Sequence, residues 1–488
     1  MPWREPLGVD ARLDFGDDAA VMSDMPRLPN ILLIVSDQHR YDCTGYSRDY
    51  PVRTPHIDRL AEGGVWFDRA YTPIPLCGPA RQAFLSGRRP EALGTLWNVG
   101  STLKIPAMEP TEYVWPRALQ RAGYRNAYIG KWHVHPEHGA TAYGYDAYVP
   151  TAAYSAYRQS HFPDVVMEKD WMGAVDPVPL EAARTHWLAD RAIEYLQDYT
   201  ADAATPWHIR LDFPEPHLPC QPVQAFAERY DPAAIPPWRS FGDTLEGKPY
   251  IQQQQLLNWN LEHHTWQDWA AAVARYYAIV EQMDDAIGKV LNRLDELGAT
   301  QNTLVIYTSD HGDMGGGHRM MDKHYVMYED VVRIPLALRW PGRIQPGRTC
   351  SRWVSHFLDL PPTLLEVIGR PVPSDFHGRS LLPLLRGEPA PGWREEVVAT
   401  YNGQQFGLYT QRMLRTEEWK YVWNATDIDE LYDLKRDTDE LHNVIADPAH
   451  REKIADFRRR LYHILVREGD GMMKGEWIRD QLLQSRKR

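Results

Sequence analysis

Two apolar runs constrain the fold of this chain more than any other feature. Asn30–Val35 and Thr303–Thr308 are dominated by branched apolar residues, and neither run alternates with polar residues. Such runs are typical of strands that are buried on both faces of a sheet. A sheet buried on both faces needs helices on each side, so we predict an α/β fold with a large, helix-flanked sheet.

Polar residues follow both runs directly. Asp37 and Gln38 come just after the first run, and Asp310 and His311 come just after the second. In open α/β sheets, ligands bind at the carboxyl ends of the strands, so we expect these side chains to share one site. Each of them alone would more often cap a helix or lie on the surface. Together, this oxygen-rich set with one nitrogen suits a hard divalent cation such as Ca²⁺, with Mg²⁺ or Mn²⁺ as alternatives.

The segment Pro75–Arg88 has the pattern of a loop that enters a short helix. Pro79 suits the first helical turn, where its missing N–H is no loss. Cys77 then lies at the helix N-terminus, where backbone N–H groups favour an anion, and Arg81 lies one turn further on the same side. A lone cysteine is usually a small buried hydrophobic residue. With these neighbours, the pattern instead predicts an anion-binding site.

This segment resembles the signature of the sulfatase family, Cys-x-Pro-x-Arg followed after four residues by Thr/Ser-Gly, with Ala80 in place of the commoner Ser. Gly123–His133 resembles the second sulfatase signature, with Asn126 in place of Ser/Thr. Ser309–Glu329 resembles a longer family run, Ser-Asp-His-Gly-Asp-Met, then Gly-x-His, Lys and Met-Tyr-Glu. The turn Pro214–Pro219 also resembles a family element.

The resemblance implies a fold, a cofactor and a maturation partner. The fold would be alkaline-phosphatase-like, with a large mixed sheet flanked by helices and a smaller C-terminal domain of an antiparallel sheet and a helix. A formylglycine-generating enzyme would convert Cys77 into formylglycine, whose hydrate attacks the sulfur of a sulfate ester. Calcium is the usual ion of the family.

The resemblance also implies roles for individual residues. Arg81 and His133 would hold and polarise the hydrate, and Lys131 and Lys323 would neutralise sulfate oxygens. His217 would protonate or hydrogen-bond the leaving alcohol. The metal ligands would be Asp37, Gln38, Asp310, His311 and the modified Cys77. We add Asn98, His318 and His324 as candidates for contacts with the substrate.

We therefore expect a sulfuric ester hydrolase that acts on a small-molecule or oligosaccharide sulfate ester. The 18 Trp and 26 Tyr suit a sugar-stacking pocket, and they suit a large core equally well. A phosphonate monoester or phosphodiester hydrolase of the same superfamily is an alternative, since it can share the formylglycine and the Gln38 and His311 variants, although Gly130–His133 favours sulfate. A non-catalytic protein that binds sulfated glycans is a third interpretation, but such a protein would be expected to have lost Cys77 or a metal ligand.

Composition shifts divide the chain into three parts. We expect a surface arm over residues 1–29, a catalytic α/β domain over residues 30–392 and a small α+β domain over residues 393–488. The Pro- and Tyr-rich segment His135–Pro179 is expected to form long loops that wall the substrate pocket. Further predicted elements are helices over Leu180–Tyr199, Trp266–Leu297 and Asp447–Arg467, a strand over Pro206–Phe213, three short C-terminal strands, and a solvated basic end over Arg479–Arg488.

Charge and cysteine content exclude several classes of function. A net charge of −12 gives no broad electrostatic footprint for nucleic acid, so positive charge must be concentrated at the site. Cys43, Cys77, Cys220 and Cys350 are too far apart for a zinc motif and too few for a disulfide framework. No apolar run approaches the ~20 residues of a membrane span, and no secretory pattern precedes Asn30, so we expect a cytoplasmic protein without a membrane partner. Export, which is common in the family that the chain resembles, stays open as the alternative. The oligomeric state stays open, with a homo-oligomer as one option.

Overall fold

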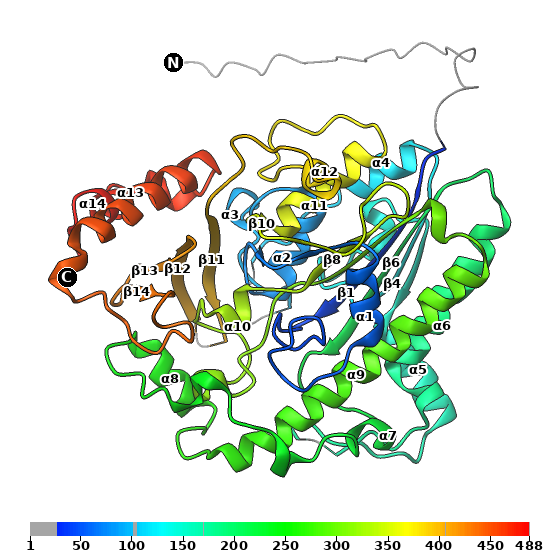
Figure 1. Cartoon of the computed structure of the whole chain (residues 1–488), viewed down its shortest axis with the longest axis horizontal. Helices are drawn as coiled ribbons and strands as arrows, with labels where there is room; N and C mark the ends of the chain where they lie inside the picture. Colours follow the sequence, from blue (N-terminus) through cyan, green and yellow to red (C-terminus); the bar gives the residue numbers. More distant parts are fainter. Residues whose placement is uncertain (1–26, 101–104, 169, 406, 488) are drawn as a thin grey trace, which may run out of the picture.

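The computed structural model describes residues 27–100, 105–168, 170–405 and 407–487. The N-terminal arm expected over residues 1–29 therefore lies almost entirely outside the described residues. Two larger sheets, one small two-stranded sheet and the helices around them make up the described part of the chain (Figure 1).

The larger sheet has eight strands in the order β5-β4-β6-β1-β7-β8-β2-β9. In that order their bounds are Ala147–Pro150, Arg125–Gly130, Trp207–Pro216, Asn30–Asp37, Thr303–Ser309, Leu336–Arg339, Val65–Phe67 and Arg348–Cys350. The central strands β6, β1 and β7 run parallel, whereas β8 runs antiparallel to both of its neighbours, so the sheet is mixed. The predictions of buried strands after residues 30 and 303 are confirmed, because every residue of β1 and β7 is buried.

Helices cover both faces of this sheet. Alternate residues of β1 belong to two different apolar clusters: Leu32 and Ile34 pack with one set of helices, and Leu33 and Val35 pack with the other. The first face carries α1 (Pro55–Glu62), α6 (Arg184–Ala201) and α9 (Trp266–Glu296), and the second carries α2 (Cys77–Ser86), α4 (Trp115–Arg121) and α11 (His356–Val367) (Figure 1). This confirms the helix-flanked α/β fold that the uniformly apolar strands predict.

The segment expected to form long loops between residues 135 and 179 contains regular structure. Strand β5 extends the sheet, and α5 (Thr151–His161) follows it directly. The prediction of loops was wrong here because flanking prolines concealed a short segment that is rich in Ala and Tyr. Tyr154 anchors α5, since its buried ring lies 5.7 Å from the ring of Trp187 on α6.

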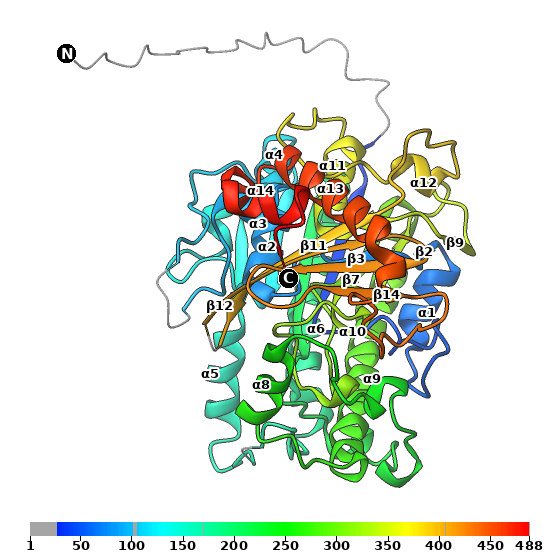
Figure 2. The ribbon, with the colours of Figure 1, turned by 90° about the vertical axis from the view of Figure 1, so that its left-hand side faces the viewer.

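The smaller sheet is antiparallel and has the strand order β11-β12-β13-β14. Its strands span Val397–Gln404, Gly407–Arg415, Trp419–Asn424 and Glu430–Asp433. Helices α13 (Arg451–Arg467) and α14 (Glu476–Leu483) cover one face of it (Figure 2). The basic end is not simply solvated as predicted, because α14 forms there and Lys487 donates a hydrogen bond to the buried Asp429.

Shorter elements complete the described chain. A two-stranded sheet pairs β3 (Ala70–Tyr71) with β10 (Val354–Ser355). The short helices are α3 (Pro90–Leu93), α7 (Gln224–Ala227), α8 (Tyr250–Asn258), α10 (Glu329–Val332) and α12 (Leu382–Arg386). Within the described ranges, no helix combines the length and the apolar character needed to cross a bilayer.

We expect Leu461→Ala to lower the free energy of unfolding by about 2–5 kcal/mol, because the loss of a fully buried side chain leaves a cavity. Leu461 lies on α13 and is fully buried against the smaller sheet. Val466 lies on the same helix but is 49% exposed, so Val466→Ala should change the free energy of unfolding by less than about 0.5 kcal/mol. Urea titrations followed by circular dichroism would measure both values. Similar losses in the two variants would contradict this packing.

Candidate active site and metal centre

Three parallel strands bring the acidic residues of the site together. Asp37 ends β1, and Asp310 follows β7, which is paired with β1 so that Ser36 lies opposite Ser309. The chain turns away from β1 at Gln38, which has a φ of 70° and donates its backbone N–H to Asp310 Oδ1 at 3.1 Å. Both carboxylates therefore lie at the carboxyl edge of the sheet, where the sequence predicts them.

Cys77 meets these carboxylates from the N-terminus of α2. Its Sγ lies 3.7 Å from Asp37 Oδ1 and 3.1 Å from His311 Nε2. One ligand atom from each of Asp37, Cys77, Asp310 and His311 lies within 4.8 Å of the others, and all four residues are buried. The predicted convergence of the cysteine with the two strand ends is present in the structure.

This cluster fits a hard divalent cation by its chemistry. Two carboxylates and an imidazole are ligands that Ca²⁺, Mg²⁺ or Mn²⁺ accept. Burial and the neighbouring Asp37 carboxylate raise the pKa of Asp310, because two buried negative charges disfavour each other. A divalent cation between them would relieve that repulsion. Gln38 is the fifth predicted ligand; its Oε1 accepts a hydrogen bond from Lys323 Nζ at 2.7 Å and has a second lone pair that can bind a cation.

Arg81 forms ion pairs with three carboxylates at and beside the cluster. Its guanidinium contacts Asp37 at 3.2 Å, Asp310 at 3.0 Å and Asp212 at 2.6 Å. The Arg81, Asp37, Asp212 and Asp310 side chains are all fully buried, so solvent screens these ion pairs little. The structure thus places Arg81 in the site, with its N–H groups directed at protein carboxylates.

Two lysines add positive charge around Cys77. Lys131 Nζ lies 2.5 Å from Asp37 Oδ2, and Lys323 Nζ lies 2.9 Å from His217 Nε2. Burial raises the pKa of the Cys77 thiol, but Lys131, Lys323 and His311 lower it more, and the net result lies well below the usual range. A hydrogen bond from His133 acts in the same direction. The position of residue 77 therefore stabilises negative charge.

The three candidates for substrate contacts lie in different surroundings. Asn98 is beside the cluster, where its Oδ1 accepts a hydrogen bond from the backbone N–H of Gly78 at 2.8 Å. His324 hydrogen-bonds to the hydroxyl of Tyr401 at 2.9 Å and lies 3.0 Å from Asp322.

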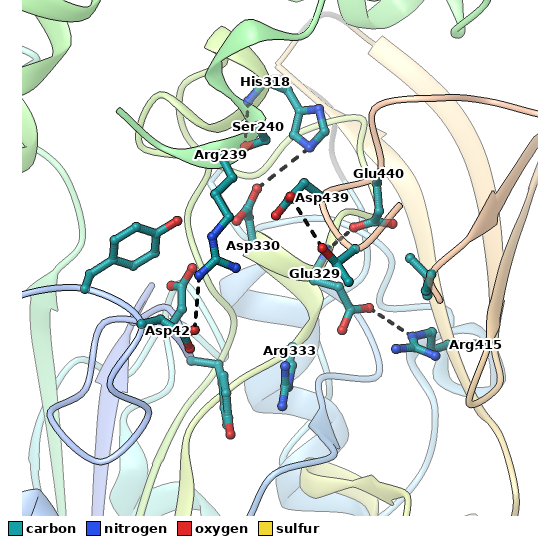
Figure 3. A pocket seen from close by; sticks show the side chains of 15 residues that line it. Asp42, Arg239, Ser240, His318, Glu329, Asp330, Arg333, Arg415, Asp439 and Glu440 are labelled. Atoms are coloured by element: carbon teal, nitrogen blue, oxygen red, sulfur yellow. Dashed lines mark hydrogen bonds and ion pairs between the residues drawn. The ribbon is translucent and has the colours of Figure 1, made fainter. Parts of the chain in front are cut away.

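His318 belongs to a separate charged pocket of about 320 Å³ (Figure 3). Its ring stacks on Tyr328 at 3.7 Å and its Nδ1 lies 2.5 Å from Asp243. Its backbone N–H donates to Ser240 at 3.3 Å, and Nε2 lies 4.0 Å from Asp330 (Figure 3). None of these contacts involves the residues around Cys77.

Sequence reasoning missed Asp212, which lies on β6 next to β1. Its carboxylate accepts hydrogen bonds from Arg81 at 2.6 Å, from Arg210 at 2.8 Å and from the hydroxyl of Tyr128 at 2.7 Å. The available signal was the pair Arg210 and Asp212 at alternate positions of a buried strand. Two opposite charges on one side of a buried strand must pair with each other or with a third group.

Comparisons with known proteins agree with this geometry. A family model described as Sulfatase matches residues 29–370, and one described as N-sulphoglucosamine sulphohydrolase, C-terminal, matches residues 316–467. The N-acetylglucosamine-6-O-sulfatase of Bacteroides thetaiotaomicron is 26% identical, over 91% of this chain and 87% of that protein.

Solved structures are similar as well. One, a complex with its substrate D-glucosamine-2-N,6-O-disulfate, has a TM-score of 0.75 and 23% identity, over 92% of this chain and all of that one. The phosphonate monoester hydrolase of Agrobacterium radiobacter has a TM-score of 0.76 and 25% identity, over 90% of this chain and 96% of that one. Because the first family model covers well over half of the sequence, the chain belongs to the sulfatase family and is a sulfuric ester hydrolase.

Proposed function

We propose that this protein hydrolyses sulfate esters of sugars. It would use a formylglycine made from Cys77 together with a divalent cation, for which Ca²⁺ is the first candidate. The observation that carries the proposal is the buried meeting of residue 77 with Asp37, Asp310 and His311. The sugar is supported by a relative named for N-acetylglucosamine 6-O-sulfate and by a structural neighbour solved with a sulfated glucosamine.

The cation would be held by five residues: Asp37, Gln38, residue 77, Asp310 and His311. The amide oxygen of Gln38 also accepts a hydrogen bond from Lys323. A divalent cation at this place lowers the pKa of an oxygen nucleophile and polarises a sulfate oxygen. The formylglycine hydrate provides that oxygen nucleophile, which a thiol does not. A formylglycine-generating enzyme is therefore a partner during maturation.

Lys131 and Lys323 are proposed to neutralise the sulfate oxygens. The Lys131 side chain is 20% exposed and pairs with Asp37, so its charge lies at the boundary between the buried cluster and solvent. The Lys323 side chain is only 2% exposed and reaches the cluster through Gln38. Fixed ammonium groups in a site with little water stabilise developing negative charge more strongly than the same groups in solution.

His217 is proposed to hold the proton for the leaving oxygen. Its Nδ1 lies 2.7 Å from the backbone carbonyl of Leu218, which can only accept, so Nδ1 carries a proton. Its Nε2 faces Lys323 Nζ at 2.9 Å and accepts a hydrogen bond from it when the histidine is neutral. His217 and Lys323 would therefore share the proton that is donated to the leaving alcohol.

Arg81 is proposed to position the metal-binding carboxylates. Nε contacts Asp310, Nη2 contacts Asp37, and Nη1 contacts both Asp212 and the carbonyl of Lys131. These contacts occupy all three nitrogens of the guanidinium. The guanidinium thus fixes the spacing of Asp37 and Asp310, and His133 remains to contact the modified residue 77 directly.

We expect Cys77→Ala to abolish sulfate ester hydrolysis, because no other side chain of the cluster can be converted to an aldehyde. Cys350→Ala is the matched control, since Cys350 is also buried but lies on β9, and this variant should keep wild-type turnover. Peptide mass spectrometry of protein produced with the maturation enzyme should find the aldehyde at residue 77. Full activity with an intact thiol there would disprove the proposed nucleophile.

Asp310→Asn should weaken the binding of Ca²⁺ by at least about tenfold, because the loss of a charged ligand removes a direct contact with the ion. Isothermal titration of metal-free protein measures this affinity without any turnover. Asp176→Asn is the control: Asp176 is also buried, but its carboxylate pairs with Arg158. Equal Ca²⁺ affinity in wild type and Asp310→Asn would exclude Asp310 as a ligand.

The similarity to a phosphonate monoester hydrolase supports a second candidate substrate class. We expect matured wild-type protein to hydrolyse nitrophenyl sulfate with a higher kcat/KM than the nitrophenyl monoester of phenylphosphonic acid, because the run Gly130–His133 resembles the sulfatase signature. Parallel kinetics on the two compounds measure the preference. A higher kcat/KM for the phosphonate would reverse the assignment while leaving the nucleophile intact.

A further inference from the structure

We propose that an apolar patch next to His217 binds the sugar ring of the substrate, with Trp171 as its stacking surface. This inference rests on the proposed function and adds a subsite to it. The patch consists of six side chains from five segments of the described chain: Trp171, Met172, Leu218, Trp259, Trp269 and Met321.

The patch adjoins the catalytic residues along the chain at two places. Leu218 follows His217 in the chain, and its carbonyl faces the Nδ1 of that histidine at 2.7 Å. Met321 precedes Lys323 by two residues, and Lys323 and His217 are 2.9 Å apart. Leu218, Met321 and Trp171 line one small cavity together. If His217 faces the leaving oxygen, the carbon skeleton bonded to that oxygen extends over these side chains.

Trp171 is placed as a platform that is open to solvent. Its side chain is 65% exposed, which is high for the largest apolar side chain. The ring of Trp259 meets it edge-on at a centroid distance of 5.7 Å and an angle of 80°, so Trp171 is supported from one side. The next residues pack tightly, because a Cβ at Gly173 would lie 2.1 Å from the carbonyl oxygen of Cys220. The platform is therefore fixed to the turn that carries His217.

The small cavity that Trp171 lines would select a ligand by the shape of one substituent and by one hydrogen bond. Its volume of about 40 Å³ is too small for a sugar ring but large enough for one substituent of the ring. Trp269 lines it, is 2% exposed, and its indole N–H has no hydrogen-bond partner among the described residues. A buried donor without a partner is destabilising, and a hydroxyl or carbonyl oxygen of the ligand would satisfy it.

A pyranose ring matches these features better than a simple aryl or alkyl group. One face of such a ring carries C–H groups, which pack on an indole, while its substituents carry oxygens that accept hydrogen bonds. An aryl group could stack on Trp171 but has no oxygen for Trp269. The patch thus favours a sugar sulfate whose ring lies on Trp171 with one oxygen-bearing substituent in the cavity.

The test measures binding without turnover. In the Cys77→Ala background, isothermal titration with N-acetylglucosamine 6-sulfate should detect binding, and adding Trp171→Ala should weaken it about tenfold. Trp171→Tyr should keep the affinity within about threefold of the parent, since an aromatic face remains, whereas Trp171→Leu should not. Trp477→Ala is the control, because Trp477 is 85% exposed on α14 and should leave the affinity unchanged.

Trp269→Phe tests the hydrogen bond separately. In matured protein it should lower kcat/KM for the sugar sulfate about tenfold and leave the hydrolysis of phenyl sulfate, whose ring carries no oxygen substituent, within about twofold, because only the indole N–H is lost. A thermal melt would confirm that this buried variant is folded. No binding of the sugar sulfate, or an affinity in Trp171→Ala within about twofold of the parent, would overturn the subsite. Failure of matured wild type to hydrolyse nitrophenyl sulfate would overturn the proposed function instead.

Discussion

The site depends on one buried guanidinium that joins three strands. Arg81 comes from α2, and its carboxylate partners follow or belong to β1, β6 and β7. Removing one partner of a buried ion pair leaves an uncompensated charge, which is more costly than the pair is favourable. Arg81 therefore couples the docking of α2 on the sheet to the geometry of Asp37 and Asp310. Since Cys77 begins the same helix, the reactive residue and the carboxylates are positioned by one set of contacts.

A second layer of charge fixes Arg81 itself. Asp212 accepts hydrogen bonds from Arg81, Arg210 and Tyr128, so two guanidinium groups share one carboxylate. Full burial of this network requires that each charge is paired, and the parallel register of β6 with β1 makes the pairing possible. A cation bound at the cluster would continue this alternation of positive and negative charges. On the substrate side, the next charged groups are Lys131 and Lys323.

The sequence predicted the parts of this arrangement that depend on local patterns. Uniformly apolar strands marked β1 and β7, and the residues directly after them marked Asp37, Asp310 and His311. The role of Asp212 was not predicted because it depends on a contact between side chains of β6 and α2, which no local pattern encodes. The surroundings of His318 could not be predicted from a local pattern either: it lies inside a recognisable motif, but its ring stacks on Tyr328, about 10 residues downstream, and its Nδ1 contacts Asp243, 75 residues upstream. Its contact with the substrate stays a prediction.

The net charge of the protein bears on how the cluster and the apolar patch each contribute to substrate binding. A net charge of −12 repels an anionic substrate at long range, but salt limits this effect to about 8 Å at physiological ionic strength. Attraction must then come from the few lysines within reach of the sulfate, and these cannot distinguish one sulfate ester from another. Only uncharged contacts beyond His217 could then discriminate between the alcohol parts of different sulfate esters. An acidic protein with a compact cationic centre therefore needs a shape-selective apolar surface beside it, and the proposed stacking of the sugar ring on Trp171 would provide that surface.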